Sequence, residues 1–311
     1  MKIGWLALLL TAQCASAAEH GAAPFAPARL EALITDSRLD EISGIAASRL
    51  ADAVYWVHND APRPASLHAI NGRGERIAQL IVEGVRAVDW EDVASFVKDG
   101  KSWLLIGDVG DNAGTRKDYE LILIEEPDLQ KSGGETLSRK PEWRMRFRYP
   151  DGAHDCEAIA IDMKAHQVLL LSKRSSTPAV YALPLAANTE QMQVARKLTE
   201  LRTLPQPTAS ERQARFPSAR LGSLPTAMDV DVESRRAIVL TYRDIWVFTR
   251  LKSESWMQAF ARAPERMPLP PMAQAEALAF DRTGESVLVS GEHLPAPLLR
   301  FDGNDNSDRG N

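Results

Sequence analysis

Residues 156–173 read CEAIAIDMKAHQVLLLSK. An acidic residue near the start, Glu157, leads into an apolar run, and a polar turn at 164–167 separates this run from a second one at 168–171. Two apolar runs joined by a short polar turn are typical of a β-hairpin. The second run leads to a cation, Lys173. The segment therefore predicts a pair of antiparallel strands with charged residues at one end.

The same pattern recurs along the chain. Segments that resemble 156–160 are DEISGIA at 40–46, WEDVA at 90–94, TAMDV at 226–230 and AEALA at 275–279. Each is followed by a turn, a second apolar run and a third strand-like run, and four of the five repeats show a fourth. Self-similarity of this kind predicts a repeat architecture.

The strand count predicts an all-β fold, a β-propeller of five four-stranded blades. The fifth repeat ends after its third strand, and a spare strand at 29–35 precedes the first repeat, so the two ends can share a blade and close the ring. A sixth blade hidden between 157 and 227 is the alternative, and 205–224 is expected to be a loop. We expect one propeller domain over 18–302 and a polar tail over 303–311.

The first residues are typical of a secretory signal peptide. A lysine precedes an apolar run at 3–12, and Ala15-Ser16-Ala17 fits a cleavage site after Ala17. The run is too short to span a bilayer comfortably, and Gln13 makes a lipoprotein site at Cys14 a poor match. After cleavage Cys156 is the single cysteine, so no internal disulfide is expected. We predict a periplasmic or secreted protein.

Composition narrows the classes of partner. The chain has 311 residues, 25% of them charged, and a formal net charge of −5. No segment gathers Lys and Arg with aromatics, which disfavours nucleic acid as a partner. No later segment approaches the length of a membrane-spanning helix. We expect a monomer that binds a small anionic ligand or a component of the cell envelope.

In a propeller the first strand of each blade lines the central channel, and its start lies on the same face as the end of the second strand. The strand-start positions are Glu41, Glu91, Glu157, Ala227 and Glu276. The strand-end positions are Asn59 with Asp60, then Asp108, Lys173 and Arg243, and finally Glu292 with His293. The two sets lie 16 residues apart in the last three repeats, 17 in the second and 18 in the first.

The strand-start carboxylates predict a metal site. Glu41, Glu91, Glu157 and Glu276 would repel one another around one channel unless they were protonated, paired with Lys173 and Arg243, or bound to a cation. Carboxylate oxygens are typical ligands of Ca²⁺ or Mg²⁺, and the six histidines show no zinc spacing. We expect Ca²⁺ on the axis. The alternative is that each Glu accepts hydrogen bonds from the neighbouring blade.

Two loops add candidate ligand-binding residues. Residues 107–116 contain three glycines together with Asp108, Asp111 and Asn112, which suits either a ligand-binding loop or a turn closed by its own side chains. Before the third repeat, His154 and Asp155 lie close to Glu157 in the sequence.

Several of these motifs also carry a resemblance. The motifs are DEISGIA (40–46), VHND (57–60), DWEDVA (89–94), GDVGDN (107–112) and the DG…DCEA stretch (151–158). Together they resemble a family of exported bacterial propeller proteins that has no settled activity. A fainter resemblance is to the calcium-activated nucleotidases (apyrases). It implies a five-bladed propeller with axial Ca²⁺ at the four strand-start glutamates, and Ala227 departs from that pattern.

Two functions follow as alternatives. In the first, the propeller is a platform whose channel mouth binds a ligand or partner. In the second, it is a metal-dependent hydrolase of a phosphate or other ester, in which Asp108 or Glu91 acts as base while Lys173 and Arg243 hold the anionic group.

Overall fold

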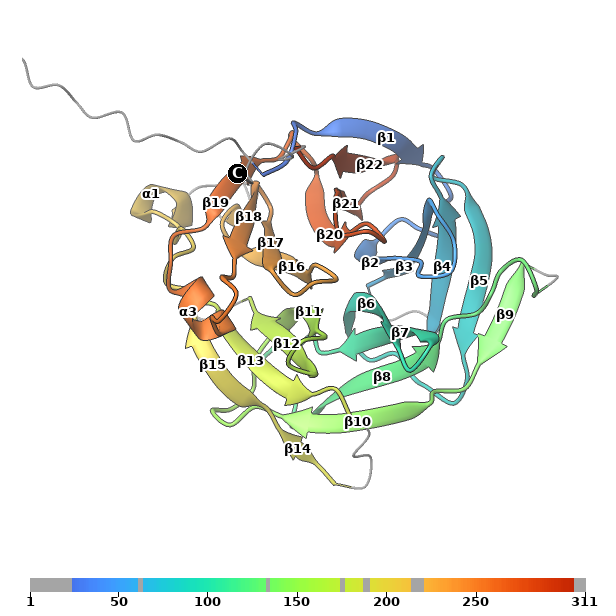
Figure 1. Cartoon of the computed structure of the whole chain (residues 1–311), viewed down its shortest axis with the longest axis horizontal. Coiled ribbons are helices and arrows are strands. Elements are labelled where there is room, and N and C mark those ends of the chain that lie inside the picture. The colour runs from blue at the N-terminus through green and yellow to red at the C-terminus, as the bar shows by residue number, and fades with distance from the viewer. Residues whose placement is uncertain are drawn as a thin grey trace, which may run out of the picture.

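The computed structural model describes residues 24–60, 64–132, 135–173, 177–186, 191–213 and 221–304. The predicted signal peptide and most of the polar tail lie outside these ranges. The described strands form five sheets around a common axis, as Figure 1 shows. The protein is a five-bladed β-propeller, which confirms the predicted fold class.

Each blade starts with a strand at the axis and ends at the periphery. Blade one contains β2 (Ile42–Ala47), β3 (Val54–Asn59), β4 (Ser66–Asn71) and β5 (Arg76–Val82); blade two contains β6 (Trp90–Lys98), β7 (Lys101–Asp108), β8 (Tyr119–Glu125) and β10 (Trp143–Arg148); blade three contains β11 (Cys156–Asp162), β12 (Gln167–Ser172), β13 (Ala179–Pro184) and β15 (Arg196–Glu200); blade four contains β16 (Pro225–Val230), β17 (Arg236–Thr241), β18 (Asp244–Thr249) and β19 (Glu265–Pro268); blade five contains β20 (Gln274–Phe280), β21 (Val287–Glu292), β22 (Ala296–Phe301) and β1 (Arg29–Ile34).

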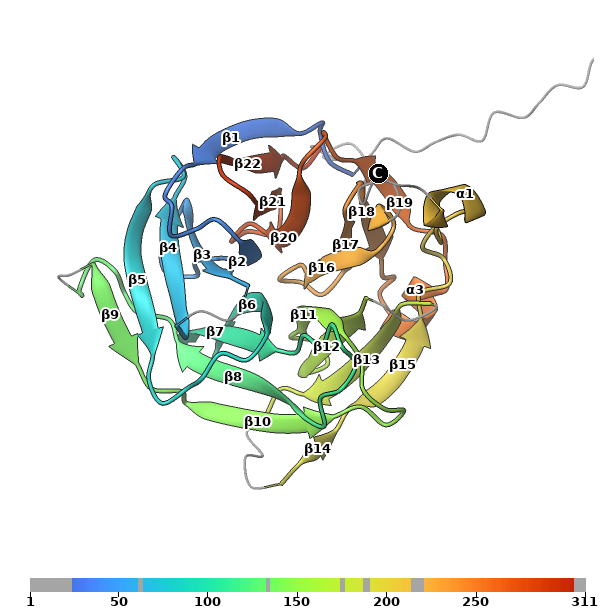
Figure 2. The ribbon, with the colours of Figure 1, turned by 180° about the vertical axis from the view of Figure 1, so that it is seen from behind.

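The two ends of the described chain share blade five. β1 pairs antiparallel with β22, with Ile34 opposite Ala296, and this pair closes the ring in both views (Figures 1 and 2). Between 157 and 227 the described residues form blade three, one short helix, α1 (Ala209–Arg212), a two-residue strand that joins blade two, and the start of blade four, so that interval adds no sixth blade. A second short helix, α3 (Trp256–Phe260), follows β18.

Two outer strands were not predicted. β9 (Thr136–Arg139) lies between two strands of blade two in the sequence but pairs in parallel with β5 of blade one. β14 (Gln193–Val194) precedes β15 in the sequence but pairs in parallel with β10 of blade two. Each therefore covers the outer edge of the preceding blade, where unpaired backbone groups would otherwise be exposed.

The apolar core lies between neighbouring blades. Buried side chains of the described residues form five clusters, one for each pair of adjacent blades. Leu105 of β7 and Leu170 of β12, for example, belong to one cluster between blades two and three. The ring therefore depends on contacts between blades as well as on strand pairing within each blade. In the part of the chain that the structure describes, no helix has the length and apolar character needed to cross a membrane.

Candidate functional site: an acidic cluster at the start of the inner strands

A β-bulge lies at the start of every inner strand. In each blade the pairing register between the first two strands shifts there and leaves one residue of the inner strand without a partner. The residues at these bulges are Ser43, Glu91, Glu157, Thr226 and Glu276. A bulge can redirect a side chain away from the normal alternation of a strand, so these residues define the equivalent positions around the axis.

Two of these positions differ from the strand starts chosen from the sequence. Blade one places Ser43 at the bulge, while Glu41 forms an isolated bridge with Glu292 of blade five. Blade four places Thr226 there, one residue before Ala227. Both hydroxyls donate to a carbonyl oxygen of the next blade, from Ser43 Oγ to Glu91 O at 2.9 Å and from Thr226 Oγ1 to Ala275 O at 2.7 Å. These positions therefore join neighbouring blades.

The other three bulges form an ionic cluster with Lys173. Its Nζ lies 2.7 Å from Glu157 Oε2 and 3.9 Å from Glu276 Oε2. The Tyr242 hydroxyl donates to Glu276 Oε1 at 2.6 Å, and Lys173 Nζ lies 5.3 Å from the centre of the Tyr242 ring. Glu91, Glu157, Glu276 and Lys173 are all buried. We call these four residues the axial cluster.

The axial cluster has three carboxyl groups and one ammonium group. Burial raises the pKa of all three glutamates, to about 8 for Glu157, and the Glu157 charge further raises the pKa of Glu91. Burial opposes the charge of Lys173, but the charges of Glu157 and Glu276 outweigh it, and its pKa is raised. One lysine cannot neutralise three ionised glutamates, so the cluster attracts protons or a further cation.

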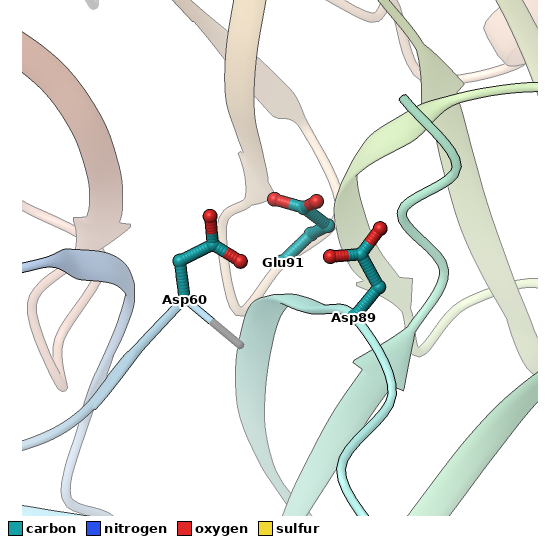
Figure 3. A group of neighbouring side chains, drawn as sticks. All are labelled: Asp60, Asp89 and Glu91. Atoms are coloured by element: carbon teal, nitrogen blue, oxygen red, sulfur yellow. The ribbon is translucent and has the colours of Figure 1, made fainter. Parts of the chain in front are cut away.

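Glu91 also belongs to two groups of carboxylates with metal-ligand spacing. In the group formed by Asp60, Asp89 and Glu91, shown in Figure 3, one oxygen from each residue lies within 4.8 Å of the others. Glu91, Asp155 and Glu157 satisfy the same condition. Oxygens bound to one Ca²⁺ at 2.3–2.6 Å are at most about 5 Å apart. Either group is therefore compact enough to bind a single ion.

The first group opens toward solvent. Asp60 and Asp89 are partly exposed, whereas Glu91, Asp155 and Glu157 are buried. Burial raises the pKa of Asp89 to about 6, and the charge of Asp60 adds to that shift. The partly exposed pair thus forms an entrance to the buried acids.

Asp108 positions the entrance. Its carboxylate accepts hydrogen bonds from the backbone N–H groups of Val88 (2.9 Å) and Asp89 (3.2 Å) and pairs with Arg116 at 2.8 Å. Gly110 packs against the same group, and a Cβ there would lie 2.1 Å from Glu91 Oε1 and 2.6 Å from Asp89 Cγ. Glycine is therefore needed for the close approach of this loop.

Asp111 mainly closes its own loop. Its carboxylate accepts from the backbone N–H groups of Thr115 and Arg116 and from the Tyr119 hydroxyl, and its own N–H donates to Asp155 Oδ1 at 2.8 Å. Asn112 is exposed. The loop thus has the self-closing arrangement that the sequence left as an alternative, and it also orients Asp155.

Two further predicted residues, Asn59 and Glu292, are hydrogen-bonded to neighbouring groups. Asn59 bridges Arg38 O and the Glu41 N–H, and Glu292 accepts from Gln274 Nε2 at 2.6 Å. Burial raises the pKa of Glu292 to about 7.

Arg243 and His293 do not contact the axial cluster in the described structure. Arg243 pairs with Glu211 next to α1 at 2.6 Å, and the exposed His293 contacts Gln274 at 3.2 Å. Tyr242, one residue before Arg243, contacts the axial cluster instead.

Asp89 and Tyr242 were missing from the predicted set, and Asp155 was noted only as a neighbour of Glu157. Comparison with Asp155 could have revealed Asp89, because each aspartate stands two residues before a bulge glutamate, as Asp-Trp-Glu and Asp-Cys-Glu. Tyr242 would have been found by counting 16 residues from Thr226, the same spacing that separates Glu157 from Lys173.

Comparisons with known proteins add little to this geometry. No family model matches the chain, and no curated protein matches it. Among solved structures it is similar to a luciferin-regenerating enzyme, with a TM-score of 0.43 and 8% identity over 88% of this chain and 95% of that chain. A likeness this distant concerns the propeller shape alone and assigns no activity.

Proposed function

We propose that the protein binds a hard divalent cation, with Ca²⁺ as the preferred ion, at Asp60, Asp89 and Glu91. The same end of the axis would then bind a ligand. The observation that carries the proposal is the excess of buried carboxyl groups over the single Lys173. A divalent ion would supply the missing positive charge. All three ligands are carboxylate side chains, which suits Ca²⁺ better than Mg²⁺, because Mg²⁺ usually keeps several waters and binds through one or two carboxylates.

Lys173 and the bound ion would together make this end of the axis attractive to an anionic group. We further propose that the protein acts outside the cytoplasm, as the signal-peptide pattern at 1–17 indicates. The fainter resemblance to calcium-activated nucleotidases, whose strand starts carry Glu or Ser, is consistent with an axial ion, and Thr226 at the fourth bulge departs from that pattern.

Thermal unfolding of the mature protein tests the cation. After EDTA treatment, Ca²⁺ at 100 times its Kd should stabilise the native state by about 2.7 kcal/mol and raise the Tm by a few degrees. Glu91→Gln should abolish that increase in Tm, because it removes the charge of one ligand. Gly110→Ala should also abolish it, because the new Cβ would displace the ligands Glu91 and Asp89. Glu125→Gln, on the outer side of blade two, is the matched control and should respond like the unmodified protein. A Ca²⁺ effect that survives in Glu91→Gln would refute the proposed site.

A metal-dependent hydrolase is the second candidate, and the position of Asp89 favours it. This partly exposed carboxyl has a pKa near 6, so near neutral pH it is largely ionised and can accept a proton from water. Because the oxygens of Asp108 already accept backbone N–H groups, we assign it the positioning role. In this second candidate the ion would be bound by the other carboxylate group, Glu91, Asp155 and Glu157, which leaves Asp89 free to act as the base. Turnover of p-nitrophenyl phosphate with Ca²⁺ that is lost in Asp89→Asn, with Ca²⁺ binding retained, would support this reading. Equal rates in both proteins would exclude Asp89 as the base.

A further inference from the structure

The other end of the axis contains a separate cavity. Its volume is about 550 Å³, within the range typical of small-molecule sites. All five blades contribute to its lining, through Arg49, Val97, Met163, Val232 and Arg282 in blade order. Along β6, Val97 lies six residues beyond Glu91, which corresponds to about 20 Å at 3.3 Å per residue. This distal cavity is therefore distinct from the axial cluster and from the proposed cation site.

Apolar side chains form about half of the lining of the distal cavity. Val97 and Val232 have exposed fractions of 52% and 47%, respectively, although both line a concave surface. Ile161 and Met163 extend the apolar surface from blade three. Aliphatic side chains left in contact with water around one hollow indicate a site for an apolar group.

The two arginines at this cavity differ in their partners: Arg282 pairs with Asp52 at 2.5 Å, whereas Arg49 is bonded to neutral oxygens. Arg49 donates from Nε and Nη2 to Ser95 O, at 3.2 and 2.9 Å, and from Nη1 to Arg282 O at 3.0 Å. Within the described ranges, no carboxylate lies at ion-pair distance from its guanidinium group. A partly buried guanidinium that is bonded to neutral carbonyls can still gain from an anion.

The acidic residues of the same cavity are bonded to other groups. Asp229 accepts from the N–H groups of Val230 at 2.7 Å and Phe280 at 2.8 Å, one for each carboxylate oxygen. Asp231 accepts from Arg236 Nε at 3.0 Å and from a backbone N–H at 2.7 Å. Both carboxylates therefore accept hydrogen bonds from the protein, and the charge of Asp229 also acts on Arg49. Arg49 still has spare N–H donors beside the apolar wall.

We propose that the distal cavity binds a small organic anion with an apolar body, with its carboxylate at Arg49 and its apolar part against Val97 and Val232. This inference is independent of the proposed cation site, since no residue that lines the distal cavity belongs to that site or to the axial cluster. A medium-chain carboxylate has the required size and charge.

Calorimetric titration with octanoate, in EDTA so that no divalent ion can hold the probe, tests the proposal. Octanoate should bind the mature protein, and 1-octanol, which lacks the charge, should bind more weakly by about tenfold or more. Val232→Asp places a negative charge on the cavity wall and should weaken octanoate binding by about tenfold or more. Val194→Asp introduces the same change on β14 at a matched exposed fraction of 50% and should leave binding unchanged.

Two further variants separate this site from the acidic cluster. Glu91→Gln should bind octanoate like the unmodified protein. Arg49→Gln should bind it more weakly, and its unfolding curve will report any loss of fold separately. Absence of octanoate binding, equal affinity for 1-octanol, or equal binding by Val232→Asp and Val194→Asp would each overturn the proposal.

Discussion

At the scale of single residues, Lys173 determines how the inner acids can coexist. Its ammonium group contacts Glu157 directly and reaches Glu276 at 3.9 Å. Both carboxyls are buried, where an unpaired charge is costly, and water cannot replace the lysine. The lysine therefore contributes to stability through the acids that it neutralises.

Lys173→Met should lower the free energy of unfolding by about 3–5 kcal/mol at pH 8 in EDTA, as expected when one partner of a buried ion pair is removed. The loss should be smaller at pH 6.5, because protonation then relieves the remaining carboxylates. Urea unfolding at both pH values measures this loss in the free energy of unfolding. Lys101→Met breaks an exposed pair with Glu125 and should leave the free energy of unfolding nearly unchanged, because solvent screens that pair. An equal loss at both pH values would contradict the role given to Lys173.

At the scale of elements, two aspartates, the buried Asp92 and the partly buried Asp229, join neighbouring inner strands. Asp92 on β6 accepts from Ile159 N–H on β11 at 2.9 Å, and Asp229 on β16 accepts from Phe280 N–H on β20 at 2.8 Å. Each also accepts the N–H of the residue that follows it. The same contact thus links blade two to three and blade four to five.

Removing one such contact should weaken the ring without changing the cation site. Asp92→Ala leaves the Ile159 N–H buried without its acceptor and should lower the free energy of unfolding by about 1–3 kcal/mol. Asp92→Asn keeps one acceptor oxygen and should cost less. Urea unfolding ranks the two variants, and a Ca²⁺ titration of each serves as the control. If the asparagine variant lost as much stability as the alanine variant, the blade-to-blade hydrogen bond would not be the cause.

At the scale of the whole molecule, the buried acids make stability depend on pH. Carboxyl pKa values raised by folding mean that the native state holds protons that the unfolded chain has released. Glu292 has a pKa of about 7 and Glu157 of about 8, well above the values of unfolded chains. Their contribution to stability is therefore complete at low pH and is lost as the pH rises through these values.

The metal-free protein should accordingly become less stable between pH 6.5 and 8, by about 1–2 kcal/mol at 1.36 kcal/mol per proton and pH unit. Burial lowers the pKa values of His58 and His68 to about 4. Below pH 6.5 these two histidines make stability fall as the pH falls, which would mask the effect of the carboxyl groups. Thermal unfolding in EDTA across this range measures the effect, and saturating Ca²⁺ should reverse it. Stability that rises with pH in EDTA would show that the acids are already ionised and compensated in the native state.

Much of the fold could be predicted from the sequence, because a propeller repeats one local pattern. The five hairpins and the closing strand, predicted at 29–35 and observed at 29–34, follow from periodicity and strand count. The structure was needed to exclude the alternative of a sixth blade between 157 and 227. β9 and β14 could not be predicted this way, because each pairs with a strand of the preceding blade. That pairing depends on how neighbouring blades are placed.

For the candidate site, the repeat pattern was enough to place Glu91, Glu157 and Glu276 at equivalent positions with Lys173 near them, but it placed Glu41 and Arg243 there as well. Only the folded chain shows that Asp60, Asp89 and Asp155 approach Glu91 and that Tyr242, rather than Arg243, contacts the cluster. The physical reason is the β-bulge. One extra residue in each inner strand changes which side chain faces the axis, and only the pairing with the next strand fixes where that residue lies.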